Sequence, residues 1–328
     1  MRGGPALIRL DRPDTIPIWR QLLIIADETS PGLSRAVLKA ASATVNGSVR
    51  RDVIAALENG DMDAATAAIP WDETGALVVK RDLLTAFANA FRRAGRVVSS
   101  SIPGAAPFAV TDPSALEWVN AHGADLVTHL ASENGDAVRA SVRDAMRAIF
   151  EDGLTPQQGA DIIYARVGLT ERYSDAVDSL YRNLVEAGDP QASEKAAQRA
   201  DQLRRIRATN IGRTESQYAV QGAQTQAWAQ LVASDVIDGA NAEEQWITAE
   251  DELANSCPIC GPMDGQRVPL GDMFTTGEGD LVNAPPETHP GCRCSRVLVA
   301  DGQQMGLRAP RVLLPDPYPA RVHYRWAA

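Results

Sequence analysis

The sequence predicts a mainly α-helical protein in which a multi-helix body precedes a small, loop-rich α+β module. Between residues 33 and 233, Ala, Leu, Val and charged residues dominate, and helix-breaking residues are few. Beyond residue 239, Gly, Pro, Asp and Asn separate two short β-like segments, residues 245–248 and 295–299. The chain has 328 residues and is 45% hydrophobic, which is enough for roughly two domains with real cores.

Composition and charge exclude several classes of protein. With 23% charged residues and a mean hydropathy of -0.20, the chain lies far from the composition of disordered proteins. The strongest apolar run, residues 22–26, is far shorter than the roughly 18 residues that a membrane span needs. Arg9, Asp11 and Arg12 interrupt the N-terminus before a secretory signal develops. We therefore expect a protein that matures in a cytoplasm and has no membrane partner.

A serine- and proline-rich stretch, residues 99–113, predicts a boundary between two helical parts. The N-terminal helical region then covers residues 1–100, and the helical body covers residues 111–235. The character of the chain changes again after residue 239, so that residues 240–300 form the C-terminal module and residues 301–328 form a tail.

Capping residues predict where the helices of the body begin and end. Asp112 as N-cap, followed by Pro113, starts a helix that continues toward residue 130. The next helix has apolar residues at spacings of four, three and four and ends at Gly153. Thr155 and Gln158 have the spacing of a capping box, which predicts that a third helix begins there.

Two further helical stretches complete the body. One is expected over residues 170–187. The other, residues 190–233, is one long helix or two in tandem. Its weak points are Gly212 and Gly222, each of which costs about 1 kcal/mol relative to Ala.

Charge is distributed unevenly along the chain. The total of 42 acidic and 32 basic residues gives a net charge of -10, and residues 238–287 alone contain eleven acids against one base, Arg267. Residues 195–213 contain six bases against Asp201, and these bases wind around the expected helix. A solvated helix is therefore favoured over a nucleic-acid-binding stripe.

All four cysteines lie in the C-terminal module together with one of the four histidines, as Cys257, Cys260, His289, Cys292 and Cys294. A loop-rich segment with little apolar content gains folding energy from a tetrahedral Zn²⁺ bound by thiolates and imidazole. The sequence therefore predicts that structural zinc stabilises the module. The Cys257–Cys260 knuckle fills two positions, and which of the other three residues bind the metal stays open.

Other interpretations of the cysteines fit less well. A cytoplasmic chain of this size does not need disulfides, and a bond between Cys292 and Cys294 would be strained. A redox pair would have its second cysteine in a helix, but Gly261 and Pro262 follow Cys260. A zinc deaminase needs a His-x-Glu before its Pro-Cys-x-x-Cys, and no such motif precedes this one.

Two further pairs of residues carry less weight. His122 and His129 are two helical turns apart, or about 10 Å, which is too far for one metal, so we expect packing or surface residues. Glu250 and Glu252 resemble the Glu-x-Glu of ADP-ribosyltransferases, but two acids in an acidic loop often occur by chance. GxGxxG, Walker A, GxSxG and HExxH motifs are absent from the sequence, so the common enzyme signatures are missing.

Residues throughout the module follow a known pattern: Trp246, Thr248, Asp251, Cys257, Pro258, Ile259, Cys260, Asp264, Gly265, Pro285, Pro286 and residues 289–294. This set resembles the head-morphogenesis domain of tailed bacteriophages, the family of Mu F-like minor head proteins. Residues 211–215 resemble the family's helical Ala-Arg-Thr-Glu motif, with Gly212 where alanine is usual. The helices over residues 115–187 are similar to the family's helical body, and the resemblance covers residues 111–299.

The resemblance implies a minor capsid component present in few copies at the portal vertex, with a structural role in head assembly and DNA packaging or delivery and no enzymatic reaction. It implies a place inside the virion head, with host cytoplasm as the site of assembly. The expected partners are the portal protein, the major capsid or scaffolding protein and packaged DNA. Candidate partner-binding residues are Arg204, Arg205, Arg207, Arg213 and Glu215 and the tail arginines Arg308, Arg311, Arg321 and Arg325.

Two other classes of function stay open. One is a zinc-dependent or ADP-ribosyltransferase-type enzyme on a phage-like body, for which His289 and Glu252 would be the residues to test. The other is a zinc-ribbon nucleic-acid-binding protein. Positive charge is expected around the metal of such a binder, so the eleven acids near the cysteines argue against it.

Overall fold

The computed structural model describes residues 15–71, 76–249, 257–305 and 309–310. Within these ranges the chain is mainly α-helical, with small antiparallel sheets in its C-terminal part, which confirms the predicted class. None of the helices in the described parts combines the length and the apolar character that a membrane crossing requires.

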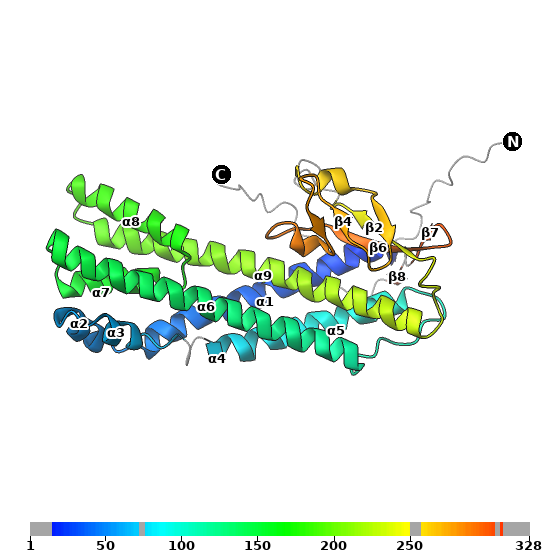
Figure 1. Cartoon of the computed structure of the whole chain (residues 1–328), viewed down its shortest axis with the longest axis horizontal. Helices are drawn as coiled ribbons and strands as arrows, with labels where there is room; N and C mark the ends of the chain where they lie inside the picture. The colour runs from blue at the N-terminus through cyan, green and yellow to red at the C-terminus, as the bar shows by residue number, and fades with distance from the viewer. Residues whose placement is uncertain (1–14, 72–75, 250–256, 306–308, 311–328) are drawn as a thin grey trace.

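Three long helices run along the longest axis of the molecule (Figure 1): α1 (Ile18–Gly47), α6 (Pro113–Asp152) and α9 (Ala192–Ala233). The shorter α4 (Ala76–Val78) continues through a π-helical turn, η2 (Val79–Leu83), into α5 (Leu84–Ser100). The remaining helices lie at the end of the bundle far from the module: α2 (Arg50–Glu58), α3 (Met62–Ala67), α7 (Pro156–Arg166) and α8 (Glu171–Glu186).

The predicted capping signals are confirmed. The Asp112 carboxylate accepts a hydrogen bond from the Ser114 backbone N–H at 3.0 Å, and Gly153 ends α6 with a φ of 71°. Thr155 and Gln158 form the capping box that starts α7. Short polar side chains satisfy backbone N–H groups that have no partner within the first turn of a helix, so these boundaries were readable from local sequence.

The two helices expected between residues 112 and 153 are instead one continuous helix, α6. No proline interrupts this stretch, and a buried apolar face runs along it through Leu126, Leu130 and Val138. Packing of that face outweighs the cost of the glycines within the helix, because tertiary contacts stabilise a helix more than local propensity does.

Residues 192–233 likewise form one helix, α9, and its glycines mark close contacts with neighbouring helices. A Cβ atom at Gly222 would lie 2.1 Å from the Trp118 ring of α6. A Cβ at Gly212 would lie 2.3 Å from the Ser34 hydroxyl of α1. The absence of a side chain at these positions permits the close approach of the three long helices.

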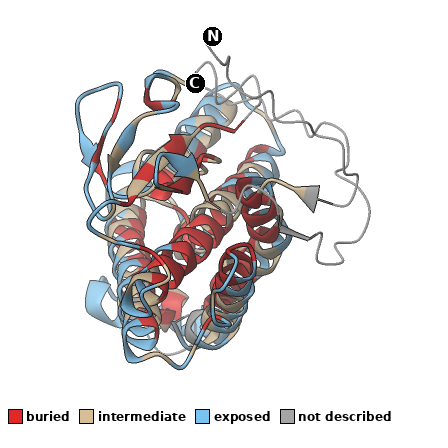
Figure 2. Ribbon diagram, turned by 90° about the vertical axis from the view of Figure 1, so that its right-hand side faces the viewer, coloured by how far each residue is buried: buried red, intermediate tan, exposed pale blue. Residues whose placement is uncertain are grey.

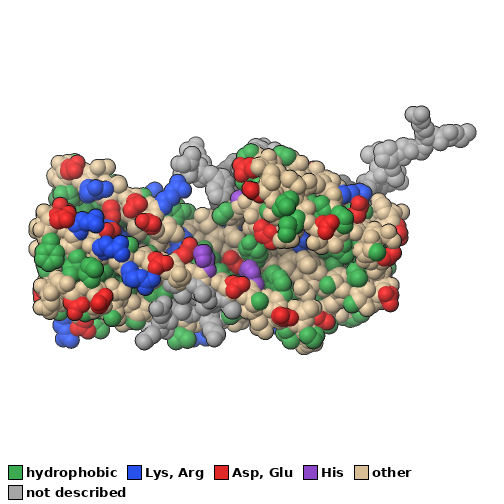
Figure 3. All heavy atoms as spheres, in the orientation of Figure 1, with side chains coloured by type: hydrophobic (Ala, Val, Ile, Leu, Met, Phe, Trp, Pro, Cys, Tyr) green, Lys and Arg blue, Asp and Glu red, His purple; other side chains and the backbone are tan. Residues whose placement is uncertain are grey.

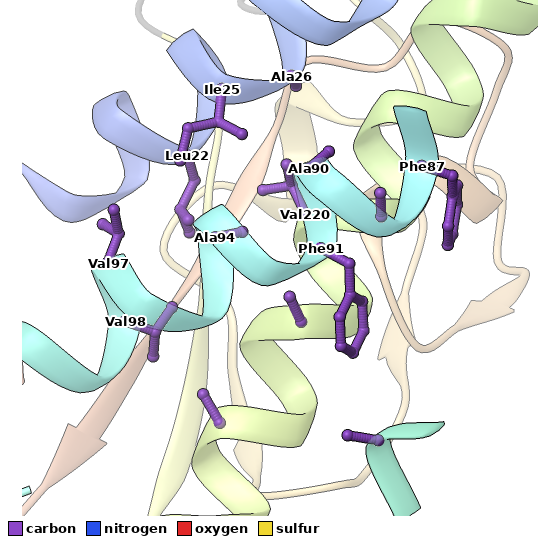
Figure 4. Packing of buried hydrophobic residues seen from close by; sticks show 14 of the residues in the cluster. Leu22, Ile25, Ala26, Phe87, Ala90, Phe91, Ala94, Val97, Val98 and Val220 are labelled. Atoms are coloured by element: carbon purple, nitrogen blue, oxygen red, sulfur yellow. The ribbon is translucent and has the colours of Figure 1, made fainter. Parts of the chain in front are cut away.

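The main hydrophobic core lies between α1, α5, α6 and α9, where buried side chains concentrate (Figure 2). Leu22 and Ile25 of α1 pack with Phe87 and Phe91 of α5 and with Val220 of α9 (Figure 4). Ile102 and Phe108, from the connection at residues 99–113, belong to the same core. Helices on both sides of the predicted boundary therefore share one core.

The C-terminal module contains a four-stranded antiparallel sheet in the order β3-β2-β6-β7. The strands are β2 (Glu243–Ile247), β3 (Arg267–Pro269), β6 (Ser295–Ala300) and β7 (Gln303–Gln304), so the two predicted β-like segments both form strands. Two pairs of strands lie apart from this sheet: β4 (Phe274–Thr275) with β5 (Leu281–Val282), and β1 (Thr15–Ile16) with β8 (Ala309–Pro310). Val297 and Leu298 of β6 extend the main core, which places the module against the bundle.

Candidate metal centre

The structure brings the five predicted metal ligands together. Cys257 and Cys260 lie just before the short helix η3 (Gly261–Met263), and the other three lie between η4 (Pro285–Glu287) and β6. The ligand atoms of Cys257, Cys260 and His289 lie within 4.8 Å of one another, as do those of Cys260, Cys292 and Cys294. Cys260 belongs to both groups and is therefore the centre of the cluster.

The distances between donor atoms match the edges of a tetrahedral zinc site. With Zn–S at about 2.3 Å and Zn–N at about 2.0 Å, tetrahedral geometry gives S···S edges of about 3.8 Å and S···N edges of about 3.5 Å. The Cys260 and Cys292 sulfurs are 3.8 Å apart. His289 Nε2 lies 3.6 Å from the Cys257 sulfur and 3.3 Å from that of Cys260. All four cysteines are free, so the cluster is not a disulfide.

Local hydrogen bonds orient the donors. The Cys260 backbone N–H points at the Cys257 sulfur at 3.4 Å, as expected where a turn directs two sulfurs toward one point. His289 Nδ1 lies 3.2 Å from the Pro290 carbonyl oxygen. A proton on Nδ1 would be donated to that oxygen, and a metal that replaced the proton on Nε2 would then meet the tautomer that a metal-ligating histidine requires.

Crowding of the donors shifts their proton affinities in opposite directions. Hydrogen bonds with Cys260 and then Cys292 raise the pKa of His289 to about 11. Hydrogen bonds with Cys260 and then Cys294 hold the pKa of Cys292 well below its usual range, whereas contacts with Cys260 and Cys292 raise the pKa of Cys294. Buried thiols this close cannot all ionise without a cation, and a bound divalent metal would neutralise them together.

A small hydrophobic core surrounds the cluster. Of its seven buried residues three are cysteines, and the others are Trp246, Met263, Phe274 and Val282. The Trp246 and Phe274 rings meet edge to face with 5.2 Å between their centroids. Because cysteines make up so large a part of this core, metal binding or oxidation at their sulfurs should strongly affect the stability of the module.

A contact that was not predicted from the sequence attaches the module to the bundle, and it centres on Arg296 of β6. This side chain is buried, and its guanidinium pairs with Glu244 of β2 at 2.6 Å. It also donates to the Thr225 hydroxyl of α9 at 2.8 Å and lies over the Trp228 ring. The one charged residue in a strand that is mostly apolar was the available signal, because a buried charge requires a partner.

The metal-binding segment itself also contacts the bundle. The Gly291 backbone N–H donates to the Thr214 hydroxyl of α9 at 3.0 Å. Arg293, between two of the cysteines, pairs with Asp27 of α1 at 3.3 Å. Thr214 belongs to the segment at residues 211–215 that resembles the family's helical motif, so this segment lies directly beside the metal-binding loop.

The five predicted partner-binding residues differ in exposure. Arg207 is buried and bonds to Asn134, the Gly168 carbonyl oxygen and Glu133, so its donors are engaged inside the bundle. Arg204 donates to backbone carbonyl oxygens of α7 and pairs with Asp201. The other three are Arg205, which is exposed, Arg213, which is half-buried, and Glu215, which is buried.

The two histidines of α6 are a packing residue and a surface residue, as expected. His122 stacks on Phe87 and Trp118, and its Nε2 lies 2.9 Å from a Glu215 carboxylate oxygen. His129 is exposed and lies 3.4 Å from Glu133. The acids and tail arginines named above lie outside the described residues: Glu250, Glu252, Arg308, Arg311, Arg321 and Arg325.

Comparison with known proteins found no matching protein-family model, no matching curated protein and no matching solved structure.

Proposed function

We propose that this chain is a non-enzymatic minor head protein of a tailed phage, associated with the portal vertex. In this role it serves head assembly and DNA packaging or delivery, from inside the head of the virion after assembly in the host cytoplasm. The observation that carries the proposal is the arrangement of the motif residues. The cysteines and His289 gather in one cluster, and the loop that carries three of them is tied to α1 and α9. This arrangement suits a module that presents a surface from a rigid helical support.

We further propose that the cluster binds structural Zn²⁺. A donor set of four sulfurs and one imidazole is typical of zinc sites, and tetrahedral edges fit the distances between the donors. The metal would supply folding energy to a module whose hydrophobic core is small. Cys257 and Cys260 would be two of the ligands, with the others drawn from His289, Cys292 and Cys294.

A structural role is favoured over catalysis by the same donor set. Catalytic zinc sites keep one position for water or substrate, whereas five protein donors crowd this cluster. Cys260, Cys292 and Cys294 are buried, which removes them further from a substrate. A role as a nucleic-acid binder is disfavoured, because the phosphate backbone would meet the acidic residues of the module.

Co-expression with the portal protein of the same phage tests the proposal. Size-exclusion chromatography, with and without a zinc chelator, shows whether the two proteins co-migrate. Co-migration that is lost on chelation supports a portal-docking protein whose metal orders the contact. Co-migration that survives chelation moves the contact to the helical body. No association at all refutes the proposed role.

A further inference from the structure

The β4–β5 hairpin has one buried face and one exposed face. Phe274 and Val282 pair across the two strands and are buried in the core of the module. Thr275 pairs with Leu281 on the other face, where Leu281 is 64% exposed. Met273 directly precedes β4 and is 50% exposed. The alternation of an extended chain would place it on the same face as Thr275. In that register Met273 would be diagonal to Leu281, at the about 7–8 Å typical of diagonal residues across a strand pair, and the two would form one apolar patch.

This patch stands out within the module. Among the described residues of the module, Met273 and Leu281 are the large hydrophobic side chains that are exposed. An apolar pair that faces solvent on an ordered ribbon gains free energy when a partner covers it, because contact with a partner removes apolar surface from water.

The hairpin is fixed to the metal-binding knuckle, so its outer face is held in place. At its turn, the Gly277 N–H donates to the Ile259 carbonyl oxygen at 3.0 Å, between the two knuckle cysteines. A Cβ atom at Gly277 would lie 2.2 Å from the Pro258 carbonyl oxygen, so only glycine permits this approach. The Thr276 N–H donates to the Asp280 carbonyl oxygen at 2.8 Å and closes the turn. A surface fixed before binding loses little conformational entropy when a partner docks.

The charged residues of the segment that carries the hairpin are all negative. Residues 270–287 contain four carboxylates and no Lys or Arg, and all four are exposed: Asp272, Glu278, Asp280 and Glu287. The visible face of the module shows acidic and hydrophobic side chains side by side, with basic side chains at its edge, whereas most of the Lys and Arg on this face gather over the far end of the bundle (Figure 3). DNA and anionic lipid would be repelled by this surface, and so would the same face of a second copy.

We infer that the outer face of the β4–β5 hairpin is a docking surface for a partner protein in which Arg or Lys side chains surround an apolar recess. Met273 and Leu281 would enter the recess, and the four carboxylates would meet the basic rim. Apolar anchors at the centre with complementary charge around them are the usual distribution of binding energy in protein interfaces. The choice of the portal protein as this partner rests on the function proposed above.

The test measures the affinity of the full zinc-loaded chain for the portal protein by biolayer interferometry. The variant Met273→Asp/Leu281→Asp places charge at both anchors. The matched control is Phe150→Asp/Val185→Asp, which changes two apolar residues of α6 and α8 that are 74% and 51% exposed. Because all four side chains face solvent, both variants should retain the zinc content and thermal midpoint of the wild type. If the hairpin variant unfolds, Met273→Ala/Leu281→Ala replaces it.

We expect the hairpin variant to bind the portal protein at least about 10-fold more weakly than the wild type, because central apolar anchors carry much of the binding energy of an interface. The control should bind within about 2-fold of the wild type. Asp272→Lys/Glu278→Lys should also weaken binding and make it less sensitive to salt. A folded hairpin variant that binds like the wild type would overturn the docking surface and leave the proposed function standing. Absence of binding by the wild type would overturn the proposed function and, with it, this choice of partner.

Discussion

Replacement of Glu244 tests how much the buried Glu244–Arg296 ion pair, which lies within the sheet of the module, contributes to the free energy of unfolding. The Glu244 and Arg296 side chains are 2% and 4% exposed, and Glu244 also accepts a hydrogen bond from the Gly271 N–H at 3.0 Å. Glu244→Ala leaves the arginine buried without its counter-charge and the Gly271 N–H without its acceptor. Removal of one partner from a buried pair costs roughly 3–5 kcal/mol. We expect about 3 kcal/mol, because Arg296 keeps Thr225 and the Asn283 carbonyl oxygen as acceptors.

Urea unfolding followed by tryptophan fluorescence measures this loss, since Trp228 lies under the Arg296 guanidinium. The control is Glu243→Ala, a neighbouring residue whose exposed side chain lies 3.8 Å from Arg267, and it should leave the midpoint unchanged. Adding Arg296→Met to Glu244→Ala should recover part of the stability, because no unpaired charge then remains buried. A wild-type midpoint for Glu244→Ala, or a double variant less stable than Glu244→Ala alone, would refute this account of the buried ion pair.

Three further predictions concern other parts of the molecule. Purified protein should contain one zinc ion per chain by mass spectrometry of the metal. Cys260→Ser should abolish zinc binding, since Cys260 belongs to both donor groups. Full zinc occupancy in that variant would contradict this geometry. Gly222→Ala should lower the free energy of urea unfolding by roughly 1–3 kcal/mol, because the new Cβ would clash with Trp118. Gly135→Ala should be neutral or stabilising, because its Cβ would approach only Arg139. Equal effects would argue against the close approach of α6 and α9. Arg81 and then Lys39 lower the pKa of Asp82 to about 2, so this carboxylate stabilises the fold above the ordinary carboxyl pKa near 4, and the contribution is lost as the pH falls through 2. Unfolding midpoints of the wild type and Asp82→Asn should therefore differ at pH 6 and converge toward pH 2, and a constant difference would contradict the assignment.

Local signals predicted much of the helical structure from the sequence. Asp112, Gly153 and Thr155 mark helix ends through bonds to residues a few positions away, so each signal is complete within one turn. The convergence of the cysteines was predictable for a similar reason. The CPxC spacing brings two sulfurs together within one turn. A metal needs further ligands, and the only other Cys and His residues of the module, which lie between residues 289 and 294, were therefore expected beside the first pair.

Features that depend on contacts between distant segments were not readable in this way. The pairing of Glu244 with Arg296 joins residues 52 positions apart, and its register follows from the antiparallel pairing of β2 with β6. From local sequence, Gly212 and Gly222 are predicted to be weak points of a helix. Their role in packing depends on Ser34 and Trp118, which belong to other helices and lie where a Cβ atom would be. Continuity of α6 and α9 likewise follows from tertiary packing, which local propensity does not report.

The metal-binding loop contributes ligands to the cluster and also bonds to the bundle. Metal binding should therefore be coupled to the packing of the module against α9. The Gly291 N–H donates to Thr214 at 3.0 Å, and His289 and Cys292 lie on either side of Gly291. A metal that orders this loop lowers the entropy cost of the bond to Thr214, and the bond in turn orders the loop for the metal. Because thermodynamic coupling is reciprocal, a change at Thr214 should alter metal affinity, although its hydroxyl accepts its hydrogen bond from the Gly291 backbone and not from a ligand side chain.

Thr214→Val keeps the shape of the side chain and removes the acceptor, leaving a half-buried N–H unsatisfied at a cost of about 1 kcal/mol. If this cost falls on the metal-bound state, zinc affinity measured against a competing chelator should decrease by about 5-fold. Thr209→Val is the matched control, because the Thr209 hydroxyl is directed at a carbonyl oxygen of its own helix, that of Arg205, at 2.8 Å. Equal zinc affinities for the two variants would mean that the loop is ordered without the bundle, and the module would then bind metal independently of its docking on α9.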